Sequence, residues 1–172
     1  TTSSNFFNGT VNLSNYNLTH NITGGNAQHN GAITGAGGII KIGVGNLLLA
    51  ATGSAYTGNT TINAGTITVS DTTGTPLGNG SLGSNVTVNT GAVLSIAQRY
   101  GSYSGTIILN GGQITVPTGA SFTRLYSPIV LTANSTFHAS SGGGGITGMT
   151  SNTINLNTHT LTCTGAGVGH LG

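Results

Sequence analysis

Charged side chains are nearly absent from this chain. Among its 172 residues there are three basic residues, Lys41, Arg99 and Arg124, and a single acidic residue, Asp71. Glycoside hydrolases ordinarily use two carboxylates, and calcium-assisted lyases need several acidic oxygens around the metal, so one carboxylate argues against both classes of enzyme. We expect Asp71 to be a turn residue. Because the three cations lie far apart in the sequence, no basic surface for nucleic acid is expected either.

Long apolar runs, paired cysteines and clustered metal ligands are missing as well. No run of about 18 apolar residues is present, so no segment is expected to span a bilayer, and the first residues lack the pattern of a signal peptide. Cys163 is the single cysteine, which excludes an internal disulfide, and we expect it to be a small buried hydrophobe on a strand. The histidines show no metal-ligand spacing, so we expect neither a metal nor a cofactor. They are His20, His29, His138, His159 and His170.

The chain is instead built from short apolar alternations separated by glycine and asparagine. The pattern is densest over residues 37–69, where Leu47 alternates with Leu49 and Ile67 with Val69. Strict alternation indicates half-buried strands, and glycine or asparagine at the breaks indicates tight turns. No window keeps an uninterrupted helical apolar face. The sequence therefore predicts an all-β protein.

One corner recurs along the chain: an apolar residue, two small or polar residues, a turn residue, one more residue and a second apolar residue. Residues 62–67, 88–93 and 109–114 are clear examples, and the first and last units begin at Leu13 and Leu156. The mean spacing of about 24 residues is typical of solenoids. We therefore expect a single-stranded parallel β-helix of roughly seven coils. Most units hold at their fourth position a residue that tolerates a positive φ. The expected structural corners are Gly45, Gly65, Gly91, Gly112, Asn134 and His159.

A single β-solenoid domain is expected over residues 1–172. Residues 1–10 are expected to be a leader, and residues 70–85 and 140–146 are expected to be loop insertions. Alternate strand residues should fill a narrow interior. The expected core residues are Ile42, Leu47, Leu49, Ile62, Ile67, Val88, Val93, Leu109, Ile114, Leu131, Leu156 and Leu161.

The last unit, residues 153–163, carries no charged or proline residue that would blunt an exposed sheet edge. Solenoids normally cap their terminal coils. We therefore expect end-to-end stacking of this coil on an adjacent repeat, or on residues 11–18 of a second copy.

Residues 35–69, GAGGIIKIGVGNLLLAATGSAYTGNTTINAGTITV, resemble the passenger-associated repeat of bacterial autotransporters, with a pertactin-like β-helix passenger, and the resemblance continues to residue 96. In that family a G-x-G-x-L-x-K-x-G-x-G-x-L-x-L segment leads into Y-T-G-x-T-x-I-x-x-G-x-L. The resemblance implies a right-handed parallel β-helix on the outer surface of a Gram-negative-type bacterium, where such passengers serve as adhesins or stalks. It also implies that Lys41 is a structural strand residue with its amine in solvent. The matching positions are Gly35, Gly37, Lys41, Gly43, Gly45, Leu47, Leu49, Tyr56, Thr57, Gly58, Thr60, Ile62 and Gly65, with Ile67 in place of the usual leucine.

We therefore expect a non-enzymatic extracellular stalk or fibre segment that supports adhesion or self-assembly. The alternative is a subunit of a self-assembling extracellular filament or sheath. A third possibility is a carbohydrate- or ice-binding module. For surface glycans the best aromatic cluster is Arg99, Tyr100 and Tyr103. For ice, the Thr66 and Thr68 pair would have to recur on successive coils, and the repeat units do not show this.

Overall fold

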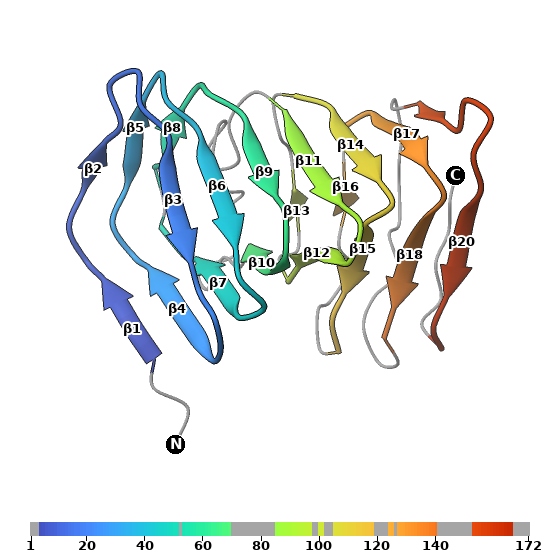
Figure 1. Ribbon diagram of the computed structural model, residues 1–172, viewed down its shortest axis with the longest axis horizontal. Coiled ribbons are helices and arrows are strands. Elements are labelled where there is room, and N and C mark those ends of the chain that lie inside the picture. The colour runs from blue at the N-terminus through green and yellow to red at the C-terminus, as the bar shows by residue number, and fades with distance from the viewer. Residues whose placement is uncertain are drawn as a thin grey trace.

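The computed structural model describes residues 4–51, 53–69, 85–97, 100–101, 105–118, 124–125, 127–140 and 153–166. Over these ranges the chain forms strands and no helix, and accordingly none of them contains a helix able to cross a membrane. Strands from successive turns lie side by side along the long axis, with β1 at one end and β20 at the other (Figure 1).

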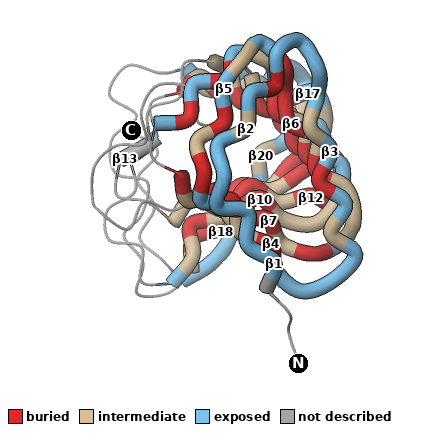
Figure 2. The backbone as a smooth tube through the Cα atoms, turned by 90° about the vertical axis from the view of Figure 1, so that its left-hand side faces the viewer, coloured by how far each residue is buried: buried red, intermediate tan, exposed pale blue. Residues whose placement is uncertain are grey.

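Three faces surround one interior, as the view along the stack shows (Figure 2). Every pairing between strands of neighbouring turns is parallel. The first face is an eight-stranded sheet of β1 (Ser4–Phe7), β4 (Asn26–His29), β7 (Asn46–Leu49), β10 (Gly65–Val69), β12 (Ala92–Ile96), β15 (Gln113–Val116), β18 (Ser135–Ala139) and β20 (Leu161–Thr164). The second is a seven-stranded sheet of β3 (Leu18–Asn21), β6 (Ile39–Ile42), β9 (Thr60–Ile62), β11 (Val86–Asn89), β14 (Ile107–Asn110), β17 (Ile129–Ala133) and β19 (Ile154–Asn155). The third holds β2 (Val11–Asn12), β5 (Ile33–Gly35) and β8 (Ala55–Tyr56), then β13 (Tyr100–Gly101) and β16 (Arg124–Leu125).

The parallel β-solenoid is confirmed, but the expected count of roughly seven coils is wrong. About 5 turns of about 22 residues are supported. The unit that begins at Leu13 explains the excess spacing. It joins β2 to β3, whereas the unit that begins at Ile42 and all later units join the seven-stranded sheet to the eight-stranded sheet. Two different corners were counted as one repeat, which lengthened the apparent period.

The core consists of inward rows that run from turn to turn. In the eight-stranded sheet, one row aligns Leu47, Ile67, Leu94 and Ile114, all at most 1 % exposed. Stacking identical faces in this way removes each apolar side chain from water on both sides. Eight of the twelve expected core residues are buried. They are Leu47, Leu49, Ile62, Ile67, Val88, Leu109, Ile114 and Leu131.

The other four expected core residues are corrected by the structure. Ile42 and Val93 are half-buried, because their strands direct the residues next to them, Lys41 and Leu94, into the interior. Leu161 is partly buried against the core, and Leu156 is 43 % exposed beside the last turn. Where a strand carries apolar residues on both of its faces, their spacing alone therefore did not predict which face points inward.

The corner glycines serve two different purposes. Gly65 and Gly91 have φ values of 69° and 77°, in the left-handed region that favours glycine. Gly45 and Gly112 do not; a Cβ there would collide with the preceding turn, at Ile22 Cγ2 and at the Val88 side chain. Close approach of neighbouring turns therefore requires these two glycines.

The remaining expected corners, Asn134 and His159, have no positive φ either. Near the last corner the left-handed residue is Asn157, with a φ of 49°, two positions before the expected one.

The expected boundaries of the domain are tested only in part. Residues 4–7, assigned to a leader, form β1 and pair in register with residues 26–29, so this segment belongs to the solenoid. The expected insertions lie almost entirely outside the described residues, since the description stops at 69 and 140 and resumes at 85 and 153.

Candidate functional site

The sequence-predicted aromatic cluster lies largely outside the described residues. Arg99 and Tyr103 are not described, and neither is Asp71. Tyr100 begins the short strand β13, whose backbone pairs with Arg124 of β16. The predicted glycan-binding cluster therefore stays a prediction.

Lys41 occupies the interior, which corrects the expectation of a solvated amine. Strand β6 alternates so that Ile39 and Lys41 point inward, and the lysine side chain is 0 % exposed. Its Nζ donates hydrogen bonds to the backbone oxygens of Ile42 at 2.9 Å, Gly43 at 2.6 Å and Ala64 at 3.2 Å. An ammonium group has three donors, so each of them has an acceptor. Lys41 thus joins the corner after β6 to the corner after β9 in the next turn.

No carboxylate among the described residues neutralises this charge, since the one acidic residue of the chain, Asp71, is not described. Burial lowers the pKa of Lys41, because desolvation disfavours the charged form. The carbonyl dipoles partly replace the lost hydration. The contacts indicate a structural role for this lysine, since all of its acceptors are backbone oxygens of the solenoid itself.

Two histidines lie next to Lys41 at the N-terminal end of the interior. His20 of β3 is the register partner of Lys41, and His29 of β4 is the register partner of Phe7 in β1. The rings of Phe7, His20 and His29 form a triangle in which each pair of centroids is 5.8 Å apart. His20 is 7 % exposed and His29 is 1 % exposed, while Phe7, beneath them, is 47 % exposed.

The imidazoles of this pair are buried without full hydrogen bonding. His20 Nε2 and both ring nitrogens of His29 have no hydrogen-bond partner. Burial, and secondarily the neighbouring His29 and Lys41, lower the pKa of His20 from 6.5 to about 4. Burial also lowers the pKa of His29. Both rings are therefore neutral at neutral pH.

The sequence analysis missed this pair because the two histidines are nine residues apart and match no motif. One signal was present: His20 follows Leu18, and His29 follows Ala27, at the period-two spacing that marks inward positions in the other strands. The pair supplies two donors, whereas structural zinc sites have four ligands and catalytic zinc sites usually have three. Within the described ranges, no three His, Cys, Asp or Glu side chains come together.

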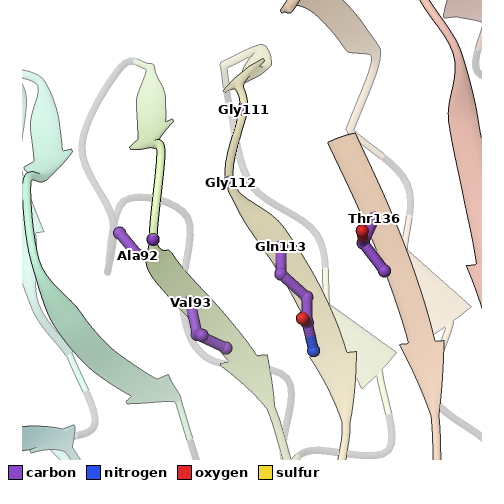
Figure 3. Close-up of a pocket in the computed structure, with 7 residues that line it drawn as sticks. Ala92, Val93, Gly111, Gly112, Gln113 and Thr136 are labelled. Carbon is purple, nitrogen blue, oxygen red and sulfur yellow. The ribbon is translucent and has the colours of Figure 1, made fainter. Parts of the chain in front are cut away.

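A shallow depression of about 140 Å³ lies on the outer face of the eight-stranded sheet. Val93, Gln113 and Thr136 project from neighbouring strands beside Gly111 and Gly112 (Figure 3). The residues that line the depression are Gly91, Ala92, Val93, Gly111, Gly112, Gln113 and Thr136. None of them is titratable near neutral pH, so the depression offers no general acid or base.

Outward polar side chains of successive turns bond mainly to one another. The Asn89 amide donates to Asn63 Oδ1 at 2.7 Å, the Asn110 amide donates to Asn89 Oδ1 at 2.9 Å, and the Thr132 hydroxyl donates to Asn110 Oδ1 at 3.2 Å. This ladder follows one edge of the seven-stranded sheet. Its hydrogen bonds hold adjacent turns in register.

The Thr66 and Thr68 pair is not repeated on the next turn. The register places Val93 beside Thr66 and Ser95 beside Thr68. The Thr68 hydroxyl also donates to Asn46 Oδ1 at 2.9 Å. Identical outward pairs on these two turns, which an ice-binding surface would need, are therefore absent.

The last described turn leaves the inward row uncovered. Cys163 is the register partner of Phe137, which is 5 % exposed, yet Cys163 itself is exposed. The expectation that Cys163 is a buried hydrophobe is therefore wrong. Among the described residues no strand lies beyond β20, so nothing there covers the side chain at this inward position.

No family model, curated protein or solved structure matches the chain.

Proposed function

We propose that this chain is a non-enzymatic structural segment, a stalk or fibre whose terminal turns stack on further turns of the same kind. The proposal rests on an exposed inward position in the last strand of the eight-stranded sheet. Strand β20 continues the inward row of Phe137 with Cys163, at a position that is buried in the preceding turns and exposed here. A further turn would bury this row and pair the edge of β20 that no described strand pairs.

The resemblance of residues 35–96 to the passenger-associated repeat supports an extracellular location on a bacterial surface and a right-handed coil. Lys41 is the most distinctive residue of that motif. Its inward amine donates hydrogen bonds to backbone oxygens of two turns, which supports a structural role for the motif. The hydrogen-bonded asparagine ladder also favours a rigid spacer, because its side chains bond to each other.

Sedimentation velocity of the 172-residue chain under reducing conditions tests whether the terminal turns associate. We expect concentration-dependent association of the unchanged chain. Cys163→Lys should abolish it, because a lysine in the inward row would lose its hydration without a counter-charge. Thr162→Lys is the matched control: its side chain lies on the other face of the same strand, beside Thr136, and it should still allow association.

Equal association of the Cys163→Lys variant would contradict stacking through this row. An unchanged chain that stays monomeric at high concentration would contradict self-stacking of separate copies and favour a stalk segment within one longer chain. Regular fibres in negative-stain images would favour the alternative, a filament or sheath subunit.

A further inference from the structure

We propose that the first two turns, residues 4–42, form an acid-sensitive end of the solenoid that opens while the later turns remain folded. The trigger is uptake of a proton by the buried His20 and His29 pair. This inference does not depend on the proposed function, because it concerns the stability of one end of the fold.

The described residues around the pair provide no counter-charge. Of the strands packed against β3 and β4, β6 contributes Lys41, β1 contributes Phe7, and β7 contributes Leu47 and Leu49. Lys41 is thus the one charged or titratable side chain that these strands direct toward the histidines. A proton on either ring would place a second positive charge in the same interior.

The position of the pair confines the effect to one end. The row of His29 continues into Leu49 and Val69, and the row of His20 and Lys41 continues into Ile62. From the third turn onward these rows are aliphatic. The first turn has a neighbouring turn on one side only among the described residues, so it opens at lower cost than a middle turn.

The sign of the pH dependence follows from the lowered pKa of His20. In the opened state this histidine returns toward its ordinary pKa of 6.5, whereas in the folded state its pKa is about 4. The opened state therefore binds more protons in this window, and folding of the first turns weakens as the pH falls from about 6.5 to about 4. Between pH 7 and pH 4.5, His20 alone raises the opening constant roughly 60-fold. His29 acts in the same direction, since burial lowers its pKa as well.

Amide hydrogen exchange of the full chain at pH 7 and pH 4.5, corrected for intrinsic exchange rates, tests this proposal. We expect protection in β3, β4 and β6 to fall by roughly 60-fold or more, and protection in β14, β15 and β17 to change by less than about threefold. A uniform loss along the solenoid would overturn the proposal, because it would show global acid denaturation. Unchanged protection in β3, β4 and β6 would overturn it as well.

Histidine variants identify the titrating groups. His20→Gln and His29→Gln remove the proton acceptor and should each reduce the pH dependence of exchange in β3 and β4. His138→Gln is the matched control, because His138 lies on the outer face of β18 and contacts Thr164, and it should leave that dependence unchanged.

A measurement on the unchanged chain keeps the proposal testable if the variants do not fold. Ring-proton resonances of His20 in the folded protein should show no titration above about pH 5. Those of His29 should titrate below the ordinary pKa of 6.5. A folded-state titration near the ordinary pKa would refute the proposal.

Discussion

Replacing Lys41 with methionine tests whether the buried ammonium stabilises the solenoid. Methionine keeps much of the apolar stem and removes all three hydrogen bonds from Nζ. The oxygen of Ile42 would keep its bond from the Ile22 amide at 3.1 Å, whereas no other donor contacts the oxygens of Gly43 and Ala64 among the described contacts. Leaving two acceptors without a donor costs about 1–3 kcal/mol each. Removing a desolvated charge offsets part of this cost.

We therefore expect Lys41→Met to lower the free energy of unfolding by about 2–4 kcal/mol. With a slope of about 2 kcal/mol per molar urea, the midpoint followed by far-UV circular dichroism should fall by about 1–2 M. The control is Ile40→Met, a half-buried outward position in the same strand, which should change stability by less than about 1 kcal/mol.

A Lys41→Met variant as stable as the original chain, or more stable, would refute this reasoning. It would mean that the desolvation penalty of the ammonium exceeds the benefit of its three hydrogen bonds, as replacement of buried charges by apolar groups has shown elsewhere.

Two further predictions separate backbone strain from packing and test the register of a strand. Gly91→Ala should cost about 1–2 kcal/mol, because its φ of 77° is strained for alanine although no atom lies within 4 Å of the added Cβ. Gly65→Ala should cost at least about 1 kcal/mol more, because its added Cβ would also meet the backbone oxygens of Gly45 and Gly43. Thermal unfolding of both variants measures the difference in stability. Equal costs for the two variants would contradict the contribution of packing at Gly65. Leu94→Asp should abolish folding or lower stability by several kcal/mol, while Val93→Asp, one position away on the outer face, should cost less than about 1 kcal/mol. Urea unfolding compares this pair, and a larger loss for Val93→Asp would show that the register is wrong.

The fold class could be predicted because the solenoid repeats a local pattern. Period-two alternation and glycine breaks located the corners at residues 62–67, 88–93 and 109–114, which join β9 to β10, β11 to β12 and β14 to β15. Each strand has the same relation to its neighbours, so a pattern of a few residues contains most of the information about the fold.

Strand β6 shows the limit of such reasoning, because its pattern did not predict which of its faces points inward. Its residues Ile39, Ile40 and Ile42 place apolar side chains in both phases of the strand, with Lys41 between them. The sequence favoured the phase that leaves the lysine in solvent. The structure adopts the other phase, because the backbone oxygens of Gly43 and Ala64, brought together by two successive corners, satisfy the ammonium.

By itself, the sequence determined an all-β chain with turns spaced for a solenoid, and its single carboxylate argued against the two-carboxylate mechanism of ordinary glycosidases. Only the tertiary structure decided that Lys41 lies inside, that His20 and His29 share its surroundings, and that Cys163 is exposed at an inward position of β20. The physical reason is that alternation specifies two faces of a strand without saying which of them meets the interior. That choice depends on hydrogen bonds and packing between residues about one turn apart, and these exist only once the turns are stacked.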